Sequence, residues 1–134
     1  MAHSFVTFEE KDIRVHDLDL AIACVLIVDA AKQNDVRPKI GPRISAMFDE
    51  WLDSISHTGP GCIDLKLDEY LSAKEDRGQL ISILEHVRTS LSNSPELSAG
   101  KLNALLLPTK IVVKSHYSAD SVVGVLDAIK TVLT

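Results

Sequence analysis

Residues 17–33 read DLDLAIACVLIVDAAKQ, and this stretch decides the architecture of the chain. Every residue between Asp19 and Asp29 is apolar, so a helix built from this stretch has no face suited to water. Such a helix belongs inside a domain, with other elements packed around it. We therefore expect residues 17–33 to form a buried central helix, with the carboxylate of Asp17 capping its first turn.

Three other stretches show the i, i+3, i+4, i+7 spacing of amphipathic helices. The clearest covers residues 43–57, the second follows a capping box at residues 72–75, and the third follows Ser118 as its N-cap. A further helix is expected to start at residues 94–96, with Leu97, Leu102, Leu105 and Leu106 as its apolar positions, and to end at Pro108. The three apolar stripes consist of Ile44, Met47, Phe48, Trp51, Leu52 and Ile55; of Leu80, Ile83, Leu84, Val87 and Leu91; and of Val122, Val125, Leu126, Ile129, Val132 and Leu133.

Strand signals are short and leave alternatives open. Residues 5–8 and 13–15 are expected to form either a small hairpin or an ordered coil on the core. Residues 63–67 are expected to form either a strand or the start of a short helix. Residues 110–114 are β-like and can pair with either region. The fold class that follows is mostly α: residues 1–134 form a single compact domain. About five helices, the buried central helix included, form a bundle around that central helix, with at most a small minor β-sheet.

Composition excludes several classes of function. The chain has 134 residues and a net charge of −5, whereas nucleic-acid-binding domains usually carry a basic stripe. Aromatic residues make up 4% and are scattered, which argues against base stacking or a ring-binding platform. The longest apolar run, residues 20–28, is too short to span a bilayer, and the first residues do not resemble a secretory signal. We expect a cytoplasmic protein that binds neither nucleic acid nor membrane.

Cysteine and histidine offer one cluster worth weighing as an active site. His57, Cys62 and Asp64 lie close together around a Gly-Pro-Gly turn, so a small enzyme with a site assembled from these residues is one interpretation. Zinc sites usually need four ligands at tighter spacing, and no phosphate-binding or nucleophile motif is present. No catalytic residue, metal or cofactor is therefore assigned. Cys24, within the central apolar run, is expected to be an inert buried thiol, with a Cys24–Cys62 disulfide as the alternative.

The most distinctive feature of the sequence is charge segregation. Between Asp49 and Asp76, eight acidic residues stand against two lysines, while the chain from Leu97 onward carries four lysines against two aspartates. A surface of one sign attracts a partner of the opposite sign and accelerates its association. The favoured function is stoichiometric binding of a basic protein partner, in an inhibitor, immunity-type or adaptor role. The partner-binding residues would be Asp49, Glu50, Asp53, Asp64, Asp68 and Glu69.

Two interpretations compete with partner binding through these acids. The first is a solvated acidic face that only keeps the protein soluble. The second is a homo-oligomeric structural protein, a homodimer included, because residues 105–107 and the Val-rich last helix offer more apolar surface than one core needs.

Overall fold

The computed structural model describes residues 3–32, 41–57, 63–93, 96–106, 113 and 117–134. Within these ranges the chain forms six helices and two small antiparallel sheets, which confirms the mostly α fold with a minor β component. The sixth helix, beyond the five expected, is the single turn α3. The elements are β1 (His3–Phe8), β2 (Lys11–His16), α1 (Asp17–Lys32), α2 (Pro42–His57), α3 (Leu67–Tyr70), α4 (Lys74–Asn93), β3 (Glu96–Leu97), α5 (Ala99–Leu106), β4 (Tyr117–Ser118) and α6 (Ala119–Leu133).

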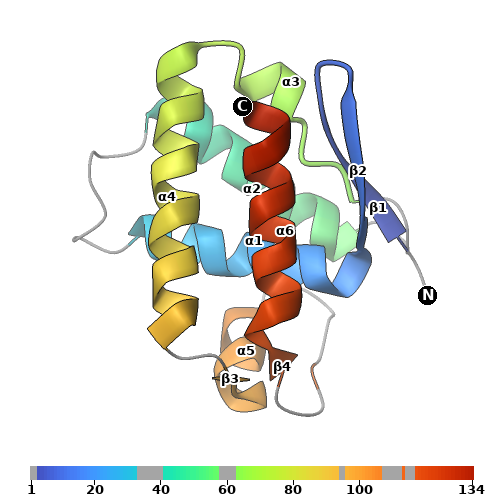
Figure 1. Ribbon diagram of the computed structural model, residues 1–134, viewed down its shortest axis with the longest axis vertical. Coiled ribbons are helices and arrows are strands. Elements are labelled where there is room, and N and C mark those ends of the chain that lie inside the picture. The colour runs from blue at the N-terminus through green and yellow to red at the C-terminus, as the bar shows by residue number, and fades with distance from the viewer. Residues whose placement is uncertain (1–2, 33–40, 58–62, 94–95, 107–112, 114–116) are drawn as a thin grey trace.

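Helix α1 is the central helix that its apolar sequence predicts. All residues from Leu20 to Val28 are buried, and the helix contacts α2, α4, α5, α6 and both strands of the hairpin. Figure 1 shows α4 and α6 side by side and antiparallel, with α1 crossing behind them. The expected span of 17–33 agrees with the observed Asp17–Lys32, and Gln33 lies outside the described residues.

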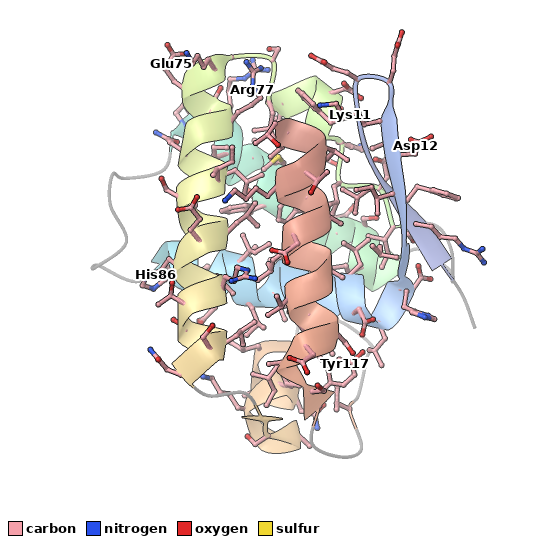
Figure 2. The ribbon with its side chains drawn as sticks, in the orientation of Figure 1. Lys11, Asp12, Glu75, Arg77, His86 and Tyr117 are labelled. Carbon is pink, nitrogen blue, oxygen red and sulfur yellow. The ribbon has the colours of Figure 1, made fainter. Side chains whose placement is uncertain are left out.

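The N-terminal segment is a hairpin rather than a coil. Strands β1 and β2 pair antiparallel, with Phe8 opposite Lys11 across the two-residue turn Glu9–Glu10. Alternate side chains of β1 are buried, among them Ser4 and Val6. Figure 2 shows Lys11 and Asp12 leaving opposite faces of β2, as the pleat requires.

Helix α2 carries the predicted amphipathic stripe, and Trp51 is its anchor. The Trp51 side chain is fully buried, its ring packs against Phe48 at 5.1 Å between centroids, and its Nε1 donates a hydrogen bond to the Leu65 carbonyl at 2.7 Å. This bond joins α2 to the stretch before α3. The remaining stripe residues are buried or half-buried: Ile44, Met47, Phe48, Leu52 and Ile55.

Helices α4 and α6 also match their predicted core stripes, every member of which is buried. The predicted N-cap of α6 is confirmed, because Ser118 Oγ accepts a hydrogen bond from the Asp120 N–H at 3.3 Å. The exposed sides of the two helices are joined by two ion pairs, Arg88–Asp127 at 3.0 Å and Lys130–Glu85 at 3.2 Å.

Two predicted elements differ from the structure. The expected helix start at residues 94–96 is wrong, because Glu96–Leu97 is the short strand β3, paired with Tyr117–Ser118, and α5 begins at Ala99. Ser98 caps α5, because its Oγ accepts a hydrogen bond from the Lys101 N–H at 3.2 Å.

The strand expected at residues 63–67 is absent. Residues 63–66 have no regular structure and Leu67 begins α3, which is the short helix that the sequence left open as the alternative.

The β-like stretch 110–114 lies outside the described residues except for Val113. Val113 is buried, and the Asn103 side chain accepts the Val113 N–H at 2.7 Å and donates to the Val113 carbonyl at 2.9 Å. This pair of bonds fixes Val113 beside α5. None of the helices described is long and apolar enough to cross a membrane.

Candidate functional site

The carboxylates predicted to bind a partner come from α2 and from residues 64–69, and the structure brings these two segments together. The Lys66 ammonium group lies 3.0 Å from the Glu50 carboxylate, and the Asp64 N–H donates to Ser54 Oγ at 3.4 Å. With the Trp51–Leu65 bond, these contacts hold residues 64–66 against α2. We call the resulting region the acidic surface: Asp49, Glu50, Asp53, Asp64, Asp68 and Glu69.

Glu50, Asp64 and Asp68 make contacts that organise the acidic surface. Glu50 pairs with Lys66, whose pKa is raised by that hydrogen bond and by the Glu50 charge. Asp64 accepts the Lys66 N–H at 2.9 Å, and Asp68 accepts the Glu9 N–H at 2.7 Å. These three acids therefore shape the region as well as charging it.

Asp49 and Glu69 are the carboxylates most available to a partner. Both side chains are exposed, and neither makes a hydrogen bond or ion pair with any described residue. Asp53 is also exposed, on the same helix as Asp49. Burial of the α2 stripe should turn Asp49, Glu50 and Asp53 toward solvent. Asp49 and Asp53 are exposed, whereas Glu50, which pairs with Lys66, is half-buried.

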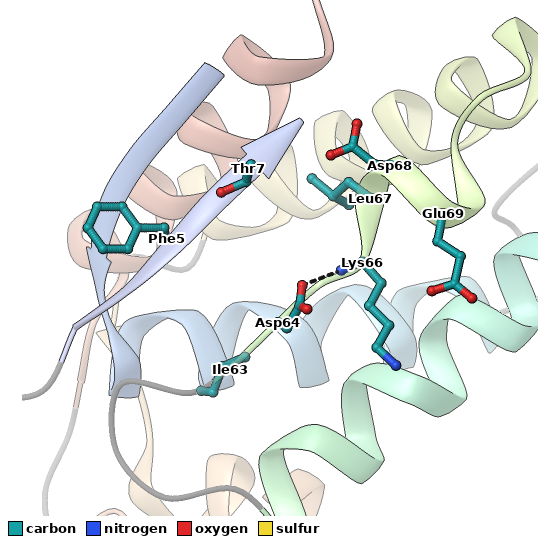
Figure 3. Close-up of a pocket in the computed structure, with 8 residues that line it drawn as sticks. All are labelled: Phe5, Thr7, Ile63, Asp64, Lys66, Leu67, Asp68 and Glu69. Atoms are coloured by element: carbon teal, nitrogen blue, oxygen red, sulfur yellow. Dashed lines mark hydrogen bonds between the residues drawn. The ribbon is translucent and has the colours of Figure 1, made fainter. Parts of the chain in front are cut away.

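A shallow hollow of about 550 Å³ borders the acidic surface (Figure 3). One side is formed by Phe5 and Thr7 of β1. Phe5 is 57% exposed, the most exposed large apolar side chain among the described residues. An aromatic ring beside carboxylates suits a ligand with both apolar and cationic groups. The other side includes Asp64, Lys66, Asp68 and Glu69.

Sequence reasoning did not assign Phe5, Thr7, Glu9 or Glu10 to this region. The only signal was the expected hairpin, which predicts that alternate residues of 5–8 face outward. Two hydrogen bonds join the hairpin to residues 63–69, Glu9–Asp68 and Ile63–Ser4, each made across a sequence separation of 59 residues. No local pattern encodes either contact.

The alternative active site is not assembled by the described residues. Cys62 and the side chain of His57 lie outside them, and Asp64 is engaged with the Lys66 N–H. Within the described ranges, no three His, Cys, Asp or Glu residues gather as metal ligands. Cys24 is buried in α1, and burial raises the pKa of its thiol, so it is held in the unreactive protonated form.

A second, smaller hollow of about 190 Å³ lies between α1, α4 and α5. Its floor is apolar, with Leu26 and Leu97 among the lining residues, and Asp29, His86 and Lys101 stand around it. Figure 2 shows His86 on α4. The charges around this hollow are mixed, in contrast to the acidic surface.

The described apolar residues that argued for an oligomer are buried or half-buried within one chain. The stripe of α6 is buried, Leu106 is buried and Leu105 is half-buried, whereas Leu107 lies outside the described residues. In the described part of the chain, only Phe5 and Leu18 are large apolar side chains that are exposed.

No protein-family model, curated protein or solved structure matches this chain. The acidic surface and the hollow beside it are therefore the features of this chain that bear on its function.

Proposed function

We propose that this chain is a stoichiometric protein-binding module whose acidic surface receives a basic segment of a partner protein. The observation that carries the proposal is the exposure of Asp49 and Glu69, whose carboxylates form no hydrogen bond or ion pair with a described residue. Glu69 also lines the hollow that the exposed Phe5 borders. Carboxylates attract and orient a cationic segment, and an exposed aromatic residue supplies apolar contact area. An inhibitor, immunity-type or adaptor role in the cytoplasm fits a module of this kind.

The acidic surface is already organised before any partner arrives. Residues 64–66 are tied to α2 through Trp51, Ser54 and Glu50, so the carboxylates need little ordering when a ligand binds. A face that only keeps the protein soluble has no need of fixed geometry. Preorganised charge is expected to raise the association rate and to make it depend on salt.

The test compares two double variants with the same change in net charge. Asp49→Lys with Glu69→Lys reverses two exposed carboxylates of the acidic surface. Glu75→Lys with Asp120→Lys reverses two exposed acids in the first turns of α4 and α6, neither of which forms an ion pair with a described residue. The probe is a fluorescent octapeptide of alternating Arg and Val, mixed with the protein by stopped flow. We expect the first double variant to slow association by about tenfold or more at low salt, and the second to change it by less than about threefold.

Stability provides the internal control. Exposed carboxylates contribute little to folding, so the Asp49/Glu69 variant should unfold within about 1 kcal/mol of the wild type in urea. Equal association rates for the two double variants would mean that only overall charge matters, and the acidic surface would then be solubilising surface.

A further inference from the structure

We propose that the basic partner binds as an extended strand along the open edge of β1, in the hollow between that edge and residues 63–69. This inference rests on the proposed function and adds the conformation of the ligand. The partner segment would alternate cationic residues with small apolar ones.

The edge of β1 that faces the hollow has unpaired backbone groups. Because Phe8 and Lys11 flank a two-residue turn, they share the closing hydrogen bond of the hairpin, and backbone groups alternate in direction from there. Ser4, Val6 and Phe8 therefore direct their N–H and C=O groups to β2. Phe5 and Thr7 direct theirs to the other edge.

Nothing in the described part of the chain pairs with that edge. β1 pairs with β2 alone among the described strands, and no described residue makes a hydrogen bond to the backbone N–H or C=O of Phe5 or Thr7. Such an edge is a template for an incoming strand.

The opposite wall of the hollow runs alongside β1 and is fixed at both ends. The Ile63 N–H donates to Ser4 Oγ at 3.2 Å near the start of β1, and the Glu9 N–H donates to Asp68 Oδ1 at 2.7 Å beyond its end. Figure 3 shows Phe5 and Thr7 on one side of this space and Asp64 and Lys66 on the other. These two hydrogen bonds fix the wall relative to β1 before a ligand enters the hollow.

The charge around the hollow selects a cationic strand. The carboxylates at its rim are Asp64, Asp68 and Glu69, and Glu9 and Glu10 add two more at the adjoining hairpin turn. The one cationic residue that lines the described hollow is Lys66, and its ammonium group is held by Glu50. Arg14, the cross-strand neighbour of Phe5, does not line it.

The first experiment uses the wild-type protein and two N-methylated forms of the Arg–Val octapeptide. One form is methylated on every Arg nitrogen of the backbone and the other on every Val nitrogen, and the dissociation constants are measured by fluorescence anisotropy. An added strand directs only alternate N–H groups to its neighbour, so one form should lose about tenfold or more in affinity while the other stays within about threefold of the parent peptide. Equal affinities would overturn the strand geometry.

The second experiment changes the protein at Thr7. Thr7→Pro removes the outward N–H without touching the β2 ladder, a position where edge strands tolerate proline. Thr7→Val is the matched control, because it keeps the N–H and loses only the hydroxyl bond to Asp12 at 2.8 Å. We expect Thr7→Pro to weaken binding of the parent octapeptide by about tenfold and Thr7→Val by less than about twofold, with both variants folded by circular dichroism.

The outcomes separate the inference from the proposed function. One outcome is that the parent peptide binds with the charge dependence described above while neither N-methylation nor Thr7→Pro changes its affinity. That result would support binding of a basic partner and overturn the strand geometry. If the parent peptide does not bind, both fail. If the wild type alone sediments as a dimer that Thr7→Pro abolishes, the edge belongs to a second copy of this chain, and the inference is overturned.

Discussion

The Trp51 side chain helps to hold the acidic surface in place. Its ring fills the core under α2, and its Nε1 holds the Leu65 carbonyl at 2.7 Å. Trp51→Ala should lower the free energy of unfolding by about 3–5 kcal/mol, as large core truncations do. Trp51→Phe keeps a buried ring but leaves a buried carbonyl unpaired, which costs about 1–3 kcal/mol.

The measurement for both Trp51 variants is urea unfolding followed by circular dichroism, because Trp51 is the single tryptophan of the chain. A loss below about 0.5 kcal/mol for Trp51→Phe would show that the bond to Leu65 contributes nothing. Thr89→Ala is the control, because the exposed Thr89 hydroxyl donates a hydrogen bond only within its own helix, to the Glu85 carbonyl. Its loss should change the free energy of unfolding by less than about 0.5 kcal/mol.

Asp19 gives the protein a predictable dependence on pH. The Tyr117 hydroxyl donates to its carboxylate, and burial raises the pKa of Asp19 above 3.8, with the charge of His16 acting in the opposite direction. Figure 2 shows Tyr117 at the end of the molecule where α6 begins. A carboxyl whose pKa is higher in the folded state favours folding below pH 3.8, and this contribution is lost as pH rises through the folded value.

Asp19→Asn should therefore gain stability relative to the wild type as pH rises. The measured quantity is the difference in free energy of unfolding between the two proteins at a series of pH values. It should move in favour of the asparagine variant from pH 3.8 upward and level off once Asp19 is ionised in the folded wild type. A difference independent of pH would show that the folded state does not perturb this carboxyl.

At the scale of elements, the entry to α3 depends on a strained backbone. Lys66 precedes α3 with φ 54°, a left-handed conformation that disfavours residues with a Cβ. Lys66→Ala and Lys66→Gly both remove the ion pair with Glu50, but only glycine relieves the strain. The glycine variant should be the more stable of the two by about 1 kcal/mol in urea unfolding.

Lys130 provides the matched comparison for Lys66. It forms an ion pair with Glu85 at 3.2 Å from within α6, where the backbone is helical. There the order should reverse, with Lys130→Ala more stable than Lys130→Gly by about 1 kcal/mol. The same order at both positions would mean that the conformation of Lys66 is not the cause.

The helices were predictable because each carries its own signal. The apolar run of α1 and the stripes of α2, α4 and α6 show period and length directly in the sequence. The start of α5 was missed because residues 96–97 pair with residues 117–118, a contact between distant segments. Alternation at residues 63–67 resembled a strand, but Leu65 and Leu67 are buried without a neighbouring strand among the described residues.

At the scale of the whole molecule, the site was only partly predictable. Outward placement of Asp49 and Asp53 follows from one helical stripe. Helix α2, residues 64–69 and the hairpin are held together by contacts such as Trp51–Leu65 and Glu9–Asp68. These contacts join segments that are distant in sequence, and no sequence pattern of either segment predicts them. The hollow and the open strand edge arise from this arrangement, so the sequence showed the charge but not the shape of the surface.

The central position of α1 has a consequence for how the protein is made. The nine apolar residues from Leu20 to Val28 leave the ribosome before two of the helices that cover them, α4 and α6, which end at Asn93 and Leu133. Contacts this distant in sequence form late. Until α6 has emerged, the nascent chain exposes an apolar segment of the kind that aggregates or is held by chaperones, and the finished fold conceals it completely.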